Sequence, residues 1–127
     1  TRNTSAVTAA CMALRKAVFE EVGGFDAEHL IVAFNDVDLC LKIRAAGYDI
    51  IWTPHATLYH HESASRGDEE VDPVKHARFK AEVAVMRERW GHRLDSDPFY
   101  GPIFDRRRSD YHIASPPYRV PPWRTAT

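Results

Sequence analysis

Two aspartates at alternate positions, Asp36 and Asp38, are the first candidates in the sequence for catalysis or metal binding. Two carboxylates with this spacing chelate a cation when both converge from the end of a buried strand. Here they stand at the start of an expected helix, where residues two apart point about 200° apart. We therefore expect no joint chelation. One carboxylate can face a cleft as a general base while the other caps the helix, and capping alone explains the pattern equally well.

Three further groups of residues could take part in chemistry. His60 and His61 follow an expected extended segment, and an imidazole there could contact a metal or a phosphate, although histidine pairs also occur on ordinary surfaces. Neighbouring residues of a strand point to opposite faces, so one of the two at most serves a given site. Arg66 lies in a Ser-Arg-Gly loop that either binds an anion or is simply solvated. The basic run 106–108 is of a kind that is usually solvated and less often contacts a membrane surface or a phosphate.

The helix that carries the two aspartates is expected to begin at Asn35 and to stop at Gly47. Asn35 suits the N-cap, where its side chain accepts a hydrogen bond from a free backbone N–H group. Asp38 stands three positions later and complements both the cap and the positive end of the helix dipole. Gly47 can adopt the left-handed conformation that ends helices. Apolar residues cover most of the helix surface, which predicts a buried helix with an acidic, solvent-accessible start.

The elements before and after this helix are expected to be short. Residues 5–14 are almost continuously small or apolar, which predicts a strand covered on both faces. Residues 15–22 have helical spacing and end at the glycine pair 23–24, a strong turn signal. Residues 48–53 predict a short strand that Pro54 ends. Together these segments indicate an α/β arrangement.

A second long helix is expected to begin at Pro73, with Asp72 as its N-cap, and to end at Gly91. Residues 79, 83, 86 and 90 form its apolar stripe. Residues 92–127 hold six of the eight prolines and show neither a helical nor a strand period. We expect this tail to be extended over the domain or partly disordered.

Composition narrows the class of protein. The chain of 127 residues fits one domain, and its formal net charge of −1 gives no general attraction to nucleic acid or to anionic membranes. Cys11 and Cys40 lie in apolar segments, which predicts two buried free thiols in a reducing compartment. The sequence contains neither a secretory signal nor an apolar run of membrane-spanning length. Its abrupt start inside an expected core strand leads us to expect a fragment of a larger fold.

Four blocks, residues 8–16, 19–26, 35–48 and 58–67, together give the chain a family resemblance. They include Gly-Gly-Phe-Asp at 23–26 and Asn-Asp-Val-Asp at 35–38. In order and spacing they closely resemble the C-terminal half of family 2 glycosyltransferases. The tail resembles the ending of bacterial members, rhamnosyltransferases among them, that act on surface polysaccharides. The resemblance covers nearly the whole chain.

The resemblance implies a partial GT-A fold, in which a Rossmann-like sheet binds a nucleotide-sugar and an acceptor-binding half follows it. Residues 1–91 would be the acceptor-side part of that catalytic domain, with short strands and two main helices, and residues 92–127 the proline-rich tail. The sheet that holds the nucleotide, and the Asp-x-Asp motif that holds Mg²⁺ or Mn²⁺, would belong to an N-terminal half that this chain lacks.

The resemblance also assigns roles to individual residues. Asp36 matches the general base of the family, and Asn35 stands where glutamate is frequent. His60, in preference to His61, would contact the metal or the diphosphate. The residues expected to contact acceptor or substrate are Gly24, Phe25, Asp26, Asn35, Asp38 and Arg66.

The sequence therefore predicts part of an inverting glycosyltransferase that uses a nucleotide-sugar donor and a saccharide or lipid-linked acceptor. We expect a cytoplasmic location, compatible with peripheral contact at the inner face of the membrane, and self-association through the exposed strand at 5–14. The alternative is a non-catalytic module that binds a saccharide or a protein. A small histidine metalloprotein is less favoured, since no ligand cluster has complete spacing.

Overall fold

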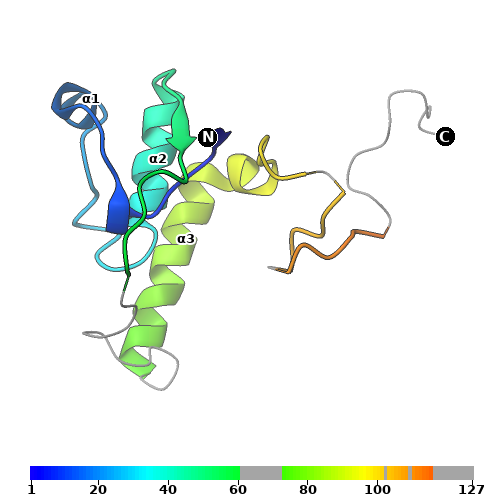
Figure 1. Ribbon diagram of the computed structural model, residues 1–127. Coiled ribbons are helices and arrows are strands. Elements are labelled where there is room, and N and C mark those ends of the chain that lie inside the picture. The colour runs from blue at the N-terminus through cyan, green and yellow to red at the C-terminus, as the bar shows by residue number, and fades with distance from the viewer. Residues whose placement is uncertain (61–72, 102, 109, 116–127) are drawn as a thin grey trace.

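The computed structural model describes residues 1–60, 73–101, 103–108 and 110–115. In chain order its elements are β1 (Arg2–Thr4), a 3₁₀ turn η1 (Ala9–Cys11), α1 (Lys16–Glu21), α2 (Asn35–Ala45), β2 (Ile50–Trp52) and α3 (Pro73–Asp95). Figure 1 shows α2 lying against the long α3, with α1 on the side of α2 away from α3 and the last described residues leaving the far end of α3. The described residues thus contain short strands and helices, and the expected GT-A arrangement stays a prediction.

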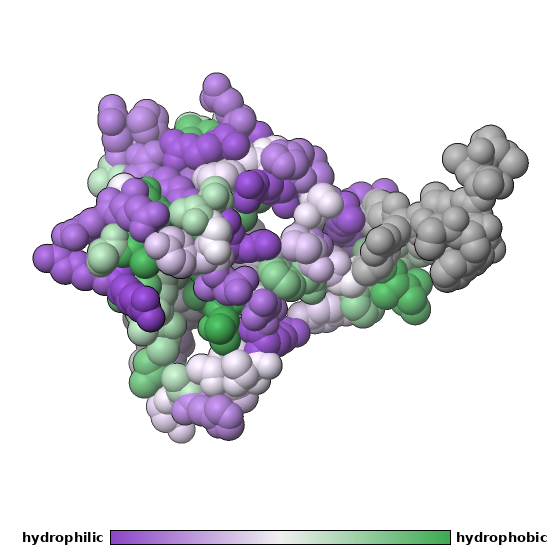
Figure 2. Space-filling view, turned by 90° about the horizontal axis from the view of Figure 1, so that it is seen from above, coloured by the Kyte–Doolittle hydropathy of each residue, from purple (hydrophilic) through white to green (hydrophobic). Residues whose placement is uncertain are grey.

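A small core joins α2 and α3. Leu30, Leu41 and Met86 are its buried members, and partly buried side chains surround them: Phe34, Val37, Val85, Trp90 and Leu94. Each fully buried aliphatic side chain contributes about 1.5–3 kcal/mol. On the face shown in Figure 2, hydrophobic residues form small separate areas among hydrophilic ones. Because the core is small, polar contacts between the helices also contribute to holding them together.

The end of α2 agrees with the prediction. Gly47 has a φ of 91°, in the left-handed region. Its N–H donates to the carbonyl of Arg44 at 3.1 Å, and the N–H of Tyr48 donates to the carbonyl of Ile43 at 3.2 Å. These two bonds form a Schellman motif, which satisfies carbonyls that the helix would otherwise leave unpaired.

The start of α2 differs from the prediction. Phe34, not Asn35, occupies the N-cap position, with a φ of 63° and no side-chain cap. Asn35 is the first helical residue, and its side chain bonds to the preceding loop: Oδ1 accepts from the N–H of Asp26 at 2.9 Å and Nδ2 donates to the carbonyl of Leu30 at 2.6 Å. We expected this side chain to cap its own helix, but its oxygen and its nitrogen bond to the loop instead.

The predicted strand over residues 5–14 is wrong. The strand β1 ends at Thr4 and pairs with β2 in an antiparallel sheet of two strands, with Asn3 opposite Ile51. Alanine, which is frequent in this segment, is depleted in strands. Thr8 accepts the N–H of Ala10 and starts the turn η1 instead. Cys11 lies on this turn and is exposed, contrary to prediction, whereas Cys40 on α2 is buried; both are free thiols.

The glycine turn after α1 was predicted correctly. Gly23 and Gly24 have φ values of 78° and 60°, a region that glycine adopts without steric cost. Gly24 is buried, and a Cβ there would lie 2.8 Å from the Phe19 ring. The turn therefore requires glycine at this position both for its conformation and for the close approach of the ring.

The second long helix continues past its predicted end. The helix α3 runs through Gly91 to Asp95, although glycine costs roughly 1 kcal/mol inside a helix. Packing compensates for this cost, because Leu94 contacts the core and the Arg93 guanidinium lies 5.8 Å from the Trp90 ring centroid. The tail thus begins as helix, and farther on Phe104 and Ile113 form an isolated antiparallel bridge. None of the helices described here is long and apolar enough to cross a membrane.

Candidate functional site

Asp36 is the second residue of α2 and is partly exposed. Its Oδ2 accepts a hydrogen bond from the backbone N–H of Ala9 at 3.1 Å, and its Oδ1 accepts from the N–H of Val37 at 2.8 Å. A carboxylate has about four acceptor positions, so these two bonds orient the group and leave it able to accept a proton from a ligand hydroxyl. The N-terminal segment thus reaches the start of α2 through Ala9.

Asp38 lies in a different environment. It is 0% exposed. Its Oδ1 accepts from Arg89 Nη1 and Trp90 Nε1, both at 2.8 Å, and its Oδ2 lies 2.8 Å from Lys42 Nζ. Burial alone would raise the pKa of Asp38, but these three donors outweigh it and lower the pKa below its ordinary value. Asp36 and Asp38 bond to different parts of the molecule, as expected from helix geometry.

Arg89 also binds Asp26, which follows the glycine turn. Its Nη2 lies 2.8 Å from Asp26 Oδ2. Asp26 Oδ1 accepts the backbone N–H groups of Glu28 and His29 at 3.1 and 2.9 Å, and His29 Nδ1 lies 3.2 Å from both carboxylate oxygens. The backbone N–H of His29 and the Arg89 guanidinium hold the pKa of Asp26 well below its usual range. One guanidinium thereby connects the loop at 26–29 to α2.

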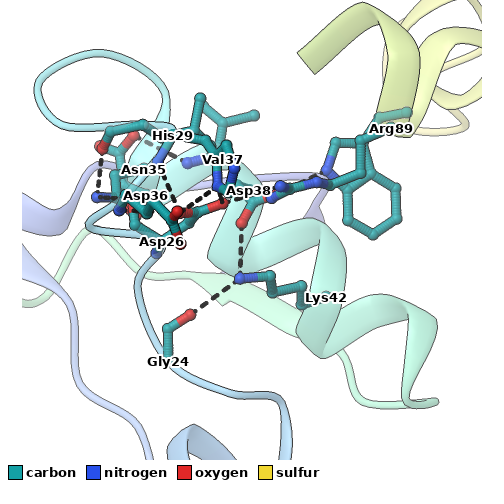
Figure 3. A network of polar contacts seen from close by, with 12 residues as sticks. Gly24, Asp26, His29, Asn35, Asp36, Val37, Asp38, Lys42 and Arg89 are labelled. Carbon is teal, nitrogen blue, oxygen red and sulfur yellow. Dashed lines mark hydrogen bonds and ion pairs between the residues drawn. The ribbon is translucent and has the colours of Figure 1, made fainter. Parts of the chain in front are cut away.

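Five of the predicted site residues lie together in this network: Gly24, Asp26, Asn35, Asp36 and Asp38 (Figure 3). Lys42 completes the network from the next turn of α2, since its Nζ donates to the carbonyl of Gly24 at 3.1 Å while it pairs with Asp38. The glycine turn, the loop after it and the start of α2 therefore form one connected unit. Sequence blocks that were recognised separately meet here in space.

The remaining predicted residues stand apart from this network. Phe25 is 45% exposed and packs edge to face on Phe19, with ring centroids 5.5 Å apart. His60 is exposed at the end of the first described segment, whereas His61 and Arg66 lie outside the described residues. Within the ranges that the structure describes, no group of three or more His, Cys, Asp or Glu residues could hold a metal ion. The predicted contact of Asp38 with an acceptor stays a prediction, although its carboxylate is fully engaged.

Sequence reasoning missed the contribution of α3. Glu82 is 2% exposed, and its Oε1 and Oε2 accept the backbone N–H groups of Val32 at 3.0 Å and Ala33 at 2.9 Å. Arg89, described above, was missed as well. A signal was available, since Glu82 and Arg89 lie four before and three after Met86, within the apolar stripe of the predicted helix. A charge on such a stripe usually has a buried partner.

An open hollow of about 1100 Å³ adjoins the site. Small and apolar side chains of the N-terminal segment line one side, and β2 lines another. Ala9 and Cys40 belong to its lining, and Ala9 is the residue that bonds Asp36. The hollow therefore reaches α2 at Cys40 and includes the residue that bonds Asp36. Its volume is large enough for a ligand of several rings, since small-molecule sites occupy roughly 300–1,000 Å³.

The basic run of the tail is engaged in local ion pairs. Arg107 contacts Asp105 through Nε at 3.1 Å and Nη2 at 2.9 Å, and Arg108 contacts Asp110 through Nε at 3.1 Å and Nη2 at 2.6 Å. Arg106 donates to the carbonyl of Asp95 at the end of α3. Arg107 and Arg108 nevertheless stay 81% and 53% exposed, which agrees with the expectation that the run is solvated.

Comparison with known proteins gives short stretches of similarity to much longer chains. Over 115 residues, 91% of its length, the chain is 52% identical to the uncharacterized protein y4gI of Sinorhizobium fredii, of which it spans 12%. It is 41% identical over 102 residues, 80% of its length, to the O-antigen biosynthesis protein RfbC of Myxococcus xanthus, of which it spans 8%. It is 34% identical over 70 residues, 55% of its length, to the N-acetylglucosaminyl-diphospho-decaprenol L-rhamnosyltransferase of Mycobacterium tuberculosis, of which it spans 22%. No family model and no solved structure matches the chain. These similarities support a glycosyltransferase-like relationship.

Proposed function

We propose that this chain is the acceptor-side part of an inverting glycosyltransferase of polysaccharide synthesis, with Asp36 as its general base. The names of the relatives support the class of reaction. One observation in the structure carries the choice of residue. Of the two carboxylates that open α2, Asp38 is buried and bonded to α3, whereas Asp36 is partly exposed and bonds to Ala9, a residue that lines the hollow.

The chemistry requires one carboxylate. In an inverting transfer the acceptor hydroxyl oxygen bonds to the anomeric carbon, while the bond from that carbon to the diphosphate oxygen breaks and its electron pair leaves with the nucleoside diphosphate. The hydroxyl proton passes to the base. No second carboxylate is needed as a nucleophile, because no covalent glycosyl-enzyme is formed. Asp36 would accept the proton, held in place by the N–H groups of Ala9 and Val37.

The acceptor would lie between the start of α2 and the loop after the glycine turn. Gly24 and Asp26 are fixed by bonds to Lys42 and Arg89, so this wall keeps its shape. Phe25 follows Gly24 in the chain and is 45% exposed, and aromatic rings present a flat apolar surface of the kind that suits the apolar face of a sugar. The wall residues would orient the hydroxyl toward Asp36 and contribute by positioning.

We propose further that the chain belongs to a GT-A domain whose donor half lies outside it. The described residues do not make a complete site for Mg²⁺ or Mn²⁺, so no step of the proposed reaction is assigned to a metal here. His60 remains the residue proposed to approach the diphosphate. Calorimetry of the isolated chain with nucleoside diphosphate and manganese should detect little binding, and tight stoichiometric binding would place the donor site within this chain.

The test of the proposed base is Asp36→Asn in the complete transferase of which we propose this chain is a part. Asparagine keeps one acceptor oxygen, so it can accept from one of the Ala9 and Val37 N–H groups. It cannot take a proton, so turnover should fall by roughly 10²–10⁴-fold while the fold is retained. Asp95→Asn, at an exposed position at the end of α3 that does not line the hollow, is the matched control and should leave turnover unchanged.

Asp38→Asn sharpens the assignment of roles. It should reduce stability more than turnover, because Asp38 contacts protein groups rather than solvent. Loss of turnover with Asp38→Asn and full activity with Asp36→Asn would reverse the two roles. Retained turnover in both variants would instead favour the non-catalytic saccharide-binding or protein-binding module.

A further inference from the structure

Glu82 is a buried acid for which the proposed chemistry has no use. Both of its carboxylate oxygens accept backbone N–H groups from the loop before α2, those of Val32 and Ala33. Arg78, one turn earlier on α3, places its Nε 3.9 Å from Oε1. A buried carboxylate is costly unless it is paired and hydrogen-bonded, and bonds to a charged acceptor are roughly twice as strong as neutral ones. Glu82 therefore ties two consecutive peptide groups of the loop to α3.

These peptide groups lie directly before the turn that starts α2. Phe34 follows them with a φ of 63°, a left-handed conformation that costs a non-glycine residue on the order of 1–3 kcal/mol and persists only where its surroundings enforce it. Its carbonyl accepts the N–H of Asp38 at 2.8 Å, the first bond of the helix. Its ring lies 5.4 Å from that of Phe79, one turn before Glu82 on α3. The helix α3 thus fixes this turn through two contacts: Glu82 binds the backbone just before Phe34, and Phe79 lies against the Phe34 ring.

The same face of α3 also holds α2 just after Asp36. Glu82, Arg89 and Trp90 are seven and eight positions apart, a spacing that places them on one side of a helix. Arg89 and Trp90 bind the Asp38 carboxylate. Asp36 therefore lies between two attachments to α3, one at residues 32–33 and one at residue 38, and α3 runs alongside both (Figure 1).

We propose that Glu82 is a positioning residue for Asp36: by fixing the peptide groups of Val32 and Ala33, it sets where the Asp36 carboxylate lies. The effect on turnover rests on the proposed function, since it requires Asp36 to be the base. The effect on geometry does not, because the carboxylate has a reporter of its own in the N–H of Ala9, which donates to Oδ2. The two effects can be measured separately.

The geometric test is the amide chemical shift of Ala9 in the isolated chain. Asp36→Ala removes the acceptor and gives the shift of the unbonded amide. Glu82→Gln, which replaces one acceptor oxygen with a donor facing a backbone N–H, should move the Ala9 shift toward that value while circular dichroism shows a retained fold. Glu88→Gln is the matched control, an exposed glutamate of the same helix, and should leave the shift unchanged.

A result confined to the loop would overturn the proposal. If Glu82→Gln perturbs the amides of Val32 and Ala33 but leaves Ala9 at its native shift, Glu82 serves the loop alone. Should Glu82→Gln fail to fold, Glu82→Asp makes the same measurement, because it keeps the charge and shortens the reach by one methylene group. An unmoved Ala9 amide in that variant, with its loop amides displaced, also contradicts the proposal.

The turnover test separates this proposal from the one on which it rests. In the complete transferase, Glu82→Gln should lower kcat roughly 10–100-fold, the effect expected of a misplaced catalytic group. It should leave KM for the nucleotide-sugar within about twofold, since the donor lies elsewhere. A displaced Ala9 amide with unchanged kcat would contradict Asp36 as the base and leave the positioning intact. An unmoved amide, with activity still lost in Asp36→Asn, would contradict the positioning alone.

Discussion

Two regions of the molecule differ in how their side chains find partners. One is the junction between α2 and α3, and the other is the N-terminal layer, which comprises residues 1–14 and β2. In the junction, Asp38 and Glu82 are buried charges with all their carboxylate oxygens engaged. In the N-terminal layer no residue is fully buried, and Ile51 and Trp52 of β2 are 58% and 45% exposed. One region is complete within this chain, and the other presents apolar surface to solvent.

The two regions differ in where the partners of their side chains lie. Both partners of every buried charge in the junction belong to this chain, so the junction is fixed by the chain alone. The N-terminal layer has β1 and β2 as its whole sheet in the described residues, and a pair of strands is marginally stable without further packing. Exposed apolar surface beside an open hollow is typical of a contact surface. Asp36 lies where the two regions meet, through its bond to Ala9.

The largest effect is expected from removing the buried carboxylate of the junction. Asp38→Ala should lower the free energy of unfolding by roughly 3 kcal/mol, the lower end of the range for broken buried ion pairs. The lower end applies because the Arg89 and Lys42 side chains are 31% and 22% exposed and still reach water. Asp36→Ala removes two hydrogen bonds to backbone and should cost about 1–2 kcal/mol. Urea unfolding at constant slope measures both.

The order of these two losses tests the comparison. Equal losses of unfolding free energy would show that the junction depends on its buried charge no more than the start of α2 depends on Asp36. A larger loss for Asp36→Ala would show that the N-terminal layer, through Ala9, carries more of the stability than its exposure indicates.

The second-largest effect is expected from low pH, which should reduce the stability that the junction provides. The pKa values of Asp26 and Asp38 lie below their ordinary value of 3.8 in the folded chain, so the unfolded chain takes up protons first as the pH falls. The stabilisation from both groups is present above about pH 4 and is lost as the pH falls toward the folded values. Unfolding free energies between pH 5 and 2.5 should therefore decrease, and the decrease should be smaller in Asp38→Asn. An unchanged acid dependence in that variant would assign the loss to other groups.

The junction and the layer also differ in how well sequence predicts them. The end of α2 followed from a local signal, since Gly47 acts within a few residues. The separate contacts of Asp36 and Asp38 followed from helix geometry, because residues two apart point in different directions. These features depend on short-range chemistry, which a single sequence records directly.

Features that depend on distant partners were not predictable in this way. Asn35 is a good N-cap by type, yet its side chain bonds to the loop at Asp26 and Leu30, a choice that only the fold decides. The apolar run 5–14 predicted a buried strand, but a strand needs neighbours, and a single sequence does not say which neighbours are present. Gly91 predicted a helix end that the packing of Leu94 overrides. The position of Glu82 on the apolar stripe indicated a buried partner, but side-chain patterns could not identify that partner, because it consists of backbone groups.

The smallest effect is expected at the surface of the N-terminal layer, where we predict weak self-association. The edges of β1 and β2 and the apolar side chains of β2 are the parts of the described chain best suited to pairing with a second copy. Sedimentation at micromolar concentration should show a concentration-dependent increase in mass. Ile51→Lys, which places a charge on β2, should suppress it, and Ile103→Lys, on the tail at 49% exposure, is the control of similar exposure that should not.

Three outcomes of that experiment distinguish the possible roles of the layer. Association that Ile51→Lys removes would identify β2 as the contact and complete the contrast with the self-sufficient junction. Association that survives Ile51→Lys but is lost in Ile103→Lys would move the contact to the tail, whose rings at Tyr100, Phe104 and Tyr111 already pack on one another. A monomer at every concentration would contradict the prediction, because it would show that the exposed side chains of β2 cost too little in water to drive pairing. Exposure of single large side chains is common on monomers, so the prediction depends on the strand edge and the apolar hollow acting together.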